Sequence, residues 1–306
     1  MVVELIAALD TFILTQTLKC NSQRTIKAYK AFICPFFDWL EGKGINEIHQ
    51  ISESLLIEYH LELESRKCIN KQKNLARVTV RTYIRNIRIF LRFCFEKKYI
   101  DEPLYKNMIM PRTEKPLIEI LSDDDLTKLI GSFDNGILGL RDNAIISLMV
   151  DSGLRLSEVS GIRKSDINFI DNYVMVTGKG RKGRIVPIGV SVRQLLIDYQ
   201  KQREVELEEV FFLTAEGNPL SSDGIRQMIK RLKKRTGMKR LYAHLLRHTF
   251  ATNFLIDGSG DVYELSRILG HSDIKITENY LHMANSYIII KNKQRRTHLD
   301  NLANKG

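Results

Sequence analysis

The sequence has few cysteines and prolines and no long apolar run. Its four cysteines, among 306 residues, form no Cys-x-x-Cys pair. This pattern excludes a zinc-finger or disulfide scaffold and is typical of reduced thiols in a cytoplasmic protein. No stretch of about 18 uninterrupted apolar residues is present, so no transmembrane helix and no membrane partner is predicted. A Walker-type GxxxxGK[ST] loop and the acidic constellation of two-metal nucleases are also missing, so we expect no ATP, metal or other cofactor.

Acidic residues are outnumbered by basic ones. The formal net charge is +11, and the sequence pI is near 9.4. A basic protein favours polyanionic partners, nucleic acid first, although many basic proteins bind none. The apolar N-terminus, residues 1–14, carries Glu4 and Asp10 and has no basic leader, so we expect an amphipathic helix there and not a signal peptide.

Residues 1–110 have the apolar periodicity of helices. Patterns with a 3.6-residue period lie near residues 22–42, 52–67 and 78–98, and serines open the first two. Five arginines on the last of these fall three or four residues apart and would form one stripe suited to phosphates: Arg77, Arg81, Arg85, Arg88 and Arg92. The alternative is a solvated helix face.

The periodicity stops in a segment rich in proline, so we predict a linker at residues 111–118 between domains at 1–110 and 119–306. Ser122 and the three aspartates that follow it predict a helix cap and not a metal site. Two short β runs flank the basic segment 178–183 and predict a hairpin. The fold class expected is mainly α, with a small antiparallel β-sheet in the C-terminal domain.

Five short motifs follow one another in the second domain. They are GLRLSE at 153–158, Lys179 in the hairpin, HLLRHTFAT at 244–252, LGH at 269–271, and Tyr280 nine residues after His271. Each motif alone is common, and Tyr280 is one of eleven tyrosines. Their order, with two arginines, a lysine, two histidines and a late tyrosine, is what carries information.

With these motifs the sequence resembles the tyrosine recombinases of the phage integrase family, most closely the Xer-like branch. The resemblance covers nearly the whole chain and implies a helical core-binding domain followed by a catalytic domain. It implies a site-specific, metal- and ATP-independent DNA strand transferase that works through a 3′-phosphotyrosyl intermediate and a Holliday junction. Glu278 and Asn279, just before the tyrosine, depart from the pair that many members carry.

Three residues are predicted to hold the scissile phosphate, and a fourth, Glu158, is predicted to support them. Arg155 and Arg247 are guanidiniums that clamp non-bridging oxygens without titrating. His271 is expected to hydrogen-bond a phosphate oxygen. Glu158 is expected to orient Arg155 or a neighbouring backbone group, and its alternative is a surface acid.

Three further residues are predicted to move protons or form bonds. Tyr280 is the nucleophile, and at neutral pH its phenol, with a pKa near 10, needs a proton acceptor. His244 is the predicted general base. Lys179 is the predicted general acid for the 5′ oxygen, and Lys182 competes with it for that role.

Residues 226–240 form a second basic segment, with eight basic residues and no acidic one. Its apolar residues predict an amphipathic helix that contacts DNA, and a membrane-surface helix is the alternative. Together with Lys182 and the arginine stripe, the predicted DNA contacts here are Arg226, Lys230, Lys233 and Lys234.

The tail after Tyr280 carries a late apolar cluster at residues 287–290. The resemblance implies that this tail docks on a neighbouring protomer of a tetrameric synapse on a specific double-stranded DNA site; docking in cis is the alternative. Type IB topoisomerases share the chemistry, and a silent DNA-binding regulator or a structural basic protein are further alternatives. Dimer resolution, transposon cointegrate resolution and integration or excision all remain open as the biological task.

Overall fold

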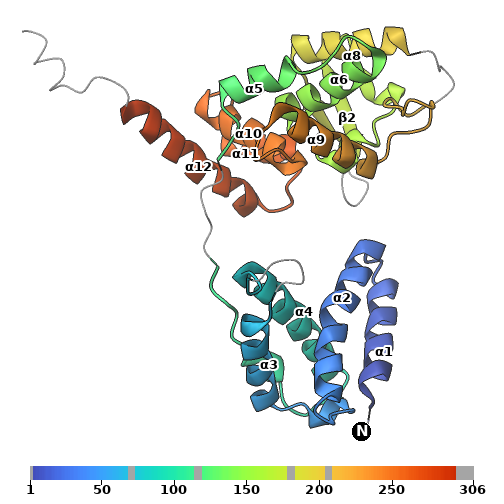
Figure 1. Ribbon diagram of the computed structural model, residues 1–306, viewed down its shortest axis with the longest axis vertical. Coiled ribbons are helices and arrows are strands. Elements are labelled where there is room, and N and C mark those ends of the chain that lie inside the picture. Colours follow the sequence, from blue (N-terminus) through green and yellow to red (C-terminus); the bar gives the residue numbers. More distant parts are fainter. Residues whose placement is uncertain (1–2, 68–72, 114–118, 178–182, 204–208, 294–306) are drawn as a thin grey trace, which may run out of the picture. The chain divides into compact units, whose positions relative to one another are not determined.

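The computed structural model describes residues 3–67, 73–113, 119–177, 183–203 and 209–293, and within the last range the side chains only up to residue 288. The chain divides into two compact units, Met1–Pro116 and Leu117–Gly306 (Figure 1). The predicted linker, residues 111–118, spans the division between them.

The first unit is built from helices. They are α1 (Leu5–Leu18), α2 (Gln23–Glu41), α3 (Glu53–Ser65) and α4 (Arg77–Glu96), with short 3₁₀ turns at Ile48–Gln50 and Leu104–Lys106. Serine caps begin two of them, because Ser22 Oγ accepts the Thr25 N–H (3.2 Å) and Ser52 Oγ accepts the Leu55 N–H (3.4 Å). These caps stand where the sequence places them.

Aromatic rings fill the core of this unit. The buried Phe12 ring of α1 makes edge contacts with Tyr29 of α2 and with Phe90 and Phe93 of α4. These contacts hold α1, α2 and α4 against one another. The helix expected at the N-terminus is present, but it is not amphipathic, because large apolar side chains are also exposed on its outer side: Ile6, Leu14 and Leu18.

The second unit is helical around one small sheet (Figure 1). Its helices are α5 (Asp123–Ile130), α6 (Ile137–Ser152), α7 (Leu156–Val159), α8 (Val190–Gln202), α9 (Ser222–Thr236), α10 (Ala243–Ile256), α11 (Val262–Leu269) and α12 (Ile274–Lys293). A 3₁₀ turn at Lys164–Asp166 precedes the strands β1 (Ile167–Asn168), β2 (Tyr173–Thr177) and β3 (Gly183–Pro187). The predicted fold class is confirmed.

The sheet is antiparallel, with the order β1-β2-β3. Val174 of β2 lies opposite Val186 of β3, and both are buried, whereas Met175 lies opposite Ile185, and both are exposed. This alternation places one face of the hairpin on the core and the other toward solvent.

Ser122 and Asp125 form a reciprocal capping box at the start of α5. This is the helix cap that the sequence predicts for Ser122 and the aspartates after it. Among the described residues, no cluster of three or more His, Cys, Asp or Glu side chains is arranged to hold a metal ion. None of the helices in these ranges has the length and apolar run needed to cross a membrane.

Glycines in the left-handed region end α6 and α9. Gly153 (φ 62°) follows α6, and Gly237 (φ 68°) follows α9. A Cβ at Gly153 would lie 2.4 Å from Phe250 Cδ1 and 2.9 Å from Leu269 Cδ2, whereas a Cβ at Gly237 would meet nothing within 4 Å. Gly153 is therefore constrained by both backbone and packing, and Gly237 by its backbone alone.

We predict that Gly153→Ala destabilises the second unit more than Gly237→Ala. The left-handed backbone costs about 1–2 kcal/mol at either position, and overpacking adds about 1–3 kcal/mol at Gly153 only. Urea unfolding followed by circular dichroism measures both variants. Trp39 is the single tryptophan and lies in the first unit, so its fluorescence follows that unit separately. Equal losses of stability in the two variants would contradict the packing argument.

Candidate active site

Arg155 lies at the turn between α6 and α7. Its backbone N–H donates to Glu158 Oε2 (2.8 Å), and its guanidinium donates from Nη1 to Glu158 Oε1 (3.0 Å) and from Nη2 to the carbonyl of Gly270 (3.2 Å). Glu158 therefore holds both the backbone and the side chain of Arg155. The Arg155 side chain is 35% exposed, so solvent still reaches it.

Glu158 is shared between Arg155 and a second arginine, Arg184 of β3. Arg184 donates from Nη1 to Oε1 (2.8 Å) and from Nη2 to Oε2 (2.9 Å), which is a bidentate pair. Burial by itself raises the pKa of Glu158, but the hydrogen bonds from Arg184 and from the Arg155 backbone hold that pKa below its ordinary value. The carboxylate is therefore charged and fully engaged.

Arg247 of α10 is the most buried cation of the site, with 4% of its surface exposed. Its Nη1 donates to the carbonyl of Gly153 (2.6 Å), and its Nη2 lies 2.8 Å from the carbonyl of Leu269 and 2.9 Å from His271 Nε2. Burial and the nearby charge of Arg155 lower the pKa of Arg247 to about 10, which leaves the guanidinium charged at neutral pH.

Three arginines donate hydrogen bonds to carbonyls at the C-terminus of α11. Arg184 Nε donates to the carbonyl of Ile268 (2.7 Å), Arg247 to that of Leu269, and Arg155 to that of Gly270. The carbonyls of residues 266 and 267 are satisfied by backbone N–H groups of the turn at Gly270. Because a helix C-terminus has unpaired carbonyls and partial negative charge, it is a suitable anchor for cations.

His271 follows this helix end and has a defined proton arrangement. Arginine has only donors, so Nε2 must accept from Arg247 Nη2. The neutral ring then carries its proton on Nδ1, which lies 2.8 Å from Thr277 Oγ1, so the Thr277 hydroxyl accepts. Burial, followed by the charges of Arg247 and Arg155, lowers the pKa of His271 to about 4, so the ring is neutral at pH 7.

Tyr280 lies on α12 and is buried, with 6% of its surface exposed. Its ring stacks over His271 at 6.3 Å between centroids and 9° between planes. Burial raises the pKa of the phenol above 10, although the charge of Arg247 and a hydrogen bond with it act in the opposite direction. The phenol is therefore protonated at neutral pH in the DNA-free chain.

Two histidines of α10, His244 and His248, lie near this part of the site. The predicted base, His244, is exposed, and its ring lies 6.1 Å from that of His248. His248 is the nearer of the two, at 5.5 Å from the Tyr280 ring, and its Nδ1 is buried without a hydrogen-bond partner among the described residues. Burial, with smaller effects from His244 and Arg247, lowers the pKa of His248 to about 4. Burial first, then Arg247, also lowers the pKa of His244.

Part of this group of residues lines an open cleft of about 1820 Å³. Arg155, Glu158, Arg184 and His271 line it, together with residues of β2, β3 and α11. The predicted residues Arg155, Glu158, Arg247, His271 and Tyr280 thus meet at one place, with His244 at its edge. Lys179 and Lys182 lie outside the described residues.

Three residues of the site were not predicted from the sequence: Arg184, His248 and Thr277. Arg184 could have been noticed, since it alternates with the apolar Val186 and so occupies the inward face of the strand. His248 is one turn beyond His244 on the same helix, which also offers a signal. Thr277 has no such signal, because a threonine in the first turns of a helix is common.

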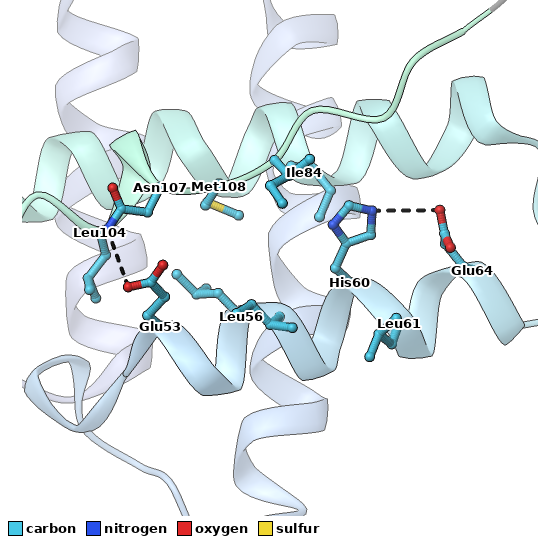
Figure 2. A pocket seen from close by; sticks show the side chains of 11 residues that line it. Glu53, Leu56, His60, Leu61, Glu64, Ile84, Leu104, Asn107 and Met108 are labelled. Carbon is cyan, nitrogen blue, oxygen red and sulfur yellow. Dashed lines mark hydrogen bonds and ion pairs between the residues drawn. The ribbon is translucent and has the colours of Figure 1, made fainter.

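A smaller pocket lies in the first unit and contains no residue of this site. It has a volume of about 280 Å³ between α3, α4 and the chain at residues 104–109. Figure 2 shows its apolar floor, formed by Leu56, Ile84 and Met108, with the Glu53–Asn107 and His60–Glu64 pairs at its ends. The pocket is not a second candidate for the chemistry described above.

The predicted DNA-contacting residues that the structure describes lie on two helices. On α4, Arg77, Arg81 and Arg85 are exposed, and Arg88 is partly so; Arg81 also donates to the carbonyl of Pro111 (2.7 Å). Arg92 pairs with Glu96.

On α9 the basic residues share the outer side. Lys230 and Lys234 are exposed, Lys233 is partly so, and Arg226 pairs with Asp223, which lies just before the basic segment. The apolar side of α9 is buried in the core of its own unit: Ile225, Met228, Ile229 and Leu232. That side is therefore not available to a membrane surface.

Comparison with known proteins gives consistent matches. The phage integrase family matches residues 119–286. The chain is 33% identical over 282 residues to tyrosine recombinase XerD of Staphylococcus aureus, which covers 89% of this chain and 92% of that protein. It is 30% identical over 282 residues to tyrosine recombinase XerC of Anoxybacillus flavithermus, covering 89% and 91%.

Solved structures share the fold at lower identity. The XerH site-specific recombinase bound to a palindromic difH substrate has a TM-score of 0.73 at 19% identity, covering 88% of this chain and 79% of that one. A lambda integrase dimer bound to a COC' core site has a TM-score of 0.69 at 17% identity, covering 91% and 95%.

We predict that Glu158→Gln lowers the free energy of unfolding by about 3 kcal/mol, because it leaves buried guanidinium charge without its counter-ion. Glu209→Gln is the matched control, since Glu209 forms an exposed ion pair with Arg163, and its loss should cost less than about 1 kcal/mol. Urea unfolding measures both. Similar small losses in the two variants would show that Glu158 is not the centre of a buried charge network.

Proposed function

This chain belongs to the phage integrase family of tyrosine recombinases, in its Xer-like branch, and we propose that it cleaves and rejoins duplex DNA at a specific site through Tyr280. The observation that carries this proposal is the convergence of Arg155, Arg247 and His271 beside the Tyr280 ring. These groups offer a nucleophile and the donors that an attacked phosphodiester requires.

The two arginines hold the scissile phosphate. Attack on the phosphodiester adds negative charge to the non-bridging oxygens, and guanidiniums bind such oxygens in a planar, bidentate manner. Arg155 supplies the solvent-accessible guanidinium, and Arg247 supplies the buried one. His271 completes the set by hydrogen-bonding a phosphate oxygen, and Glu158 keeps Arg155 in place.

Tyr280 Oη attacks the phosphorus and loses its proton to a base. His244 takes this role, because its lowered pKa leaves the imidazole neutral and able to accept a proton at pH 7. In the DNA-free chain the His248 ring lies 6.1 Å from the His244 ring and 5.5 Å from the Tyr280 ring. Catalytic hydrogen bonds often form only in the substrate complex, so His244 is expected to reach the phenol once DNA is bound.

The departing 5′ oxygen receives a proton from Lys179, with Lys182 as the competing donor. The bond from phosphorus to the 5′ oxygen breaks as the bond to Tyr280 Oη forms, which leaves a 3′-phosphotyrosyl enzyme and a free 5′ hydroxyl. Attack of a 5′ hydroxyl from the partner duplex reverses the reaction on the new strand. The phosphodiester energy is conserved, so neither ATP nor a metal is required.

Exchange of one pair of strands produces a Holliday junction, and exchange of the second pair resolves it. This sequence requires a tetramer on DNA, and the XerH complex and the lambda integrase dimer support DNA binding and oligomerisation. Tyr287 Oη accepts the N–H of Ile120 in the same chain (3.0 Å). Docking of the tail on a neighbouring protomer is therefore proposed for the residues after Tyr287.

The proposed task is resolution of DNA dimers or cointegrates in the cytoplasm. The likeness to XerD and XerC across most of the chain supports it over topoisomerase action. Integration or excision of a mobile element is the second candidate, which the shared fold with the Tn1549 transposon integrase favours (TM-score 0.68). The two differ in whether the recombining sites lie on a dimer or cointegrate or at the ends of a mobile element.

Tyr280→Phe is expected to abolish covalent capture of DNA. A nicked suicide substrate carrying the cognate site should trap a protein–DNA adduct with the wild type, visible in a denaturing gel, and none with this variant. Tyr263→Phe is the control, because Tyr263 is an exposed tyrosine of α11 and should form the adduct normally. An equal amount of adduct from Tyr280→Phe would refute the assignment.

The basic faces of α4 and α9 should contribute to affinity through phosphate contacts. Arg85→Ala and Lys230→Ala are each expected to reduce the slope of log K against log salt by about 0.9. Lys43→Ala removes one charge that is already paired with Glu58 and should leave the slope unchanged. Titration of labelled duplex at several salt concentrations measures all three. An unchanged slope in both test variants would remove these helices from the DNA interface.

A further inference from the structure

Thr277 is a fully buried residue in the first turns of α12, with none of its surface exposed. Its hydroxyl lies 2.8 Å from His271 Nδ1. A buried hydroxyl that is hydrogen-bonded to a titratable side chain orients that side chain. The reason is that, where water is excluded, neither group has an alternative hydrogen-bond partner.

The hydrogen bond is one link of a short chain. Arg247 Nη2 donates to His271 Nε2 (2.9 Å), and His271 Nδ1–H donates to Thr277 Oγ1. Thr277 precedes Tyr280 by three residues, so the two share a face of α12. The chain therefore connects the buried phosphate-binding guanidinium to the helical turn that carries the nucleophile.

We propose that Thr277 is a positioning residue for strand cleavage, which fixes the His271 ring through Nδ1 and ties that ring to the turn carrying Tyr280. This inference rests on the proposed recombinase function. With Nδ1 held, the only ring nitrogen left to face Arg247 and the phosphate is Nε2. A single buried hydroxyl thereby connects the phosphate clamp to the turn that carries the nucleophile.

A hydroxyl suits this position because it serves both neutral tautomers of the ring. In the DNA-free chain it accepts the Nδ1 proton. When Nε2 carries the proton instead, and donates to a phosphate oxygen, the hydroxyl can donate to Nδ1. Serine retains this property, and valine has nearly the same shape as threonine without it.

Cleavage kinetics test the proposal. In single-turnover reactions on the nicked suicide substrate, Thr277→Val should slow adduct formation about tenfold, as expected for one lost buried hydrogen bond. Thr277→Ser should remain within about threefold, because it keeps the bond. Thr252→Val is the matched control, since Thr252 is buried and its hydroxyl has no hydrogen-bond partner among the described residues; its rate should be unchanged.

A double-mutant comparison separates positioning from a general packing effect. In a His271→Ala background, Thr277→Val should cause no additional loss of rate, because its effect passes through the ring. A wild-type rate in Thr277→Val, or the same tenfold loss in both backgrounds, would overturn the proposal. If the wild-type protein formed no adduct at all, the proposed function itself would be overturned.

The tautomer of the His271 ring can be measured in the wild-type protein. In wild-type protein carrying ¹⁵N-labelled histidine, the His271 signal, assigned by its absence from His271→Ala, should show the proton on Nδ1 at pH 7. A proton on Nε2 in the DNA-free protein would contradict the hydrogen bond from Arg247 to His271. It would break the connection between the guanidinium and the turn that carries Tyr280, and so overturn the proposal.

Discussion

The C-terminus of α11 is the feature on which the whole site depends. The last carbonyls at this helix end have no hydrogen-bond donors within the helix, and three guanidiniums donate to them. Arg155, Arg184 and Arg247 come from three separate elements, so this one helix end assembles a strand, a turn and another helix. Gly270 makes the arrangement possible, because a Cβ there would lie 2.8 Å from Arg184 Nη1 and its φ is 64°.

The electrostatic consequence is an excess of fixed positive charge. Three guanidiniums are matched by one carboxylate, Glu158. Burial, followed by the charges of these arginines, lowers the pKa of His271 and keeps its ring neutral. The same charges oppose the burial that raises the pKa of the Tyr280 phenol. A bound phosphodiester would supply the missing negative charge, so the substrate itself completes the charge balance of the site.

Prediction from sequence succeeded where the pattern was local. Helices, their serine caps, the capping box at Ser122 and the β-hairpin all follow from short-range periodicity and turn chemistry. The outer side of α1 shows the limit of that reasoning. An amphipathic helix was expected, with polar residues on its exposed side, but large apolar residues are exposed there. The partners Arg184, His248 and Thr277 also escaped prediction. Arg184 and His248 act on Glu158 and Tyr280, which lie far from them in the chain, and Thr277 is a common residue type in the first turns of a helix.

The sequence by itself determined the class of chemistry, because the order and spacing of Arg155, His244, Arg247, His271 and Tyr280 occur together in few kinds of protein. It also determined the mainly helical fold with a small sheet. Only the tertiary structure decided which groups touch: that Glu158 joins two arginines, that His271 bridges Arg247 and Thr277, and that His248 lies nearer to Tyr280 than His244 does. The physical reason is that hydrogen bonds and pKa values depend on distances of a few ångströms and on burial, and neither can be obtained from spacing along the chain.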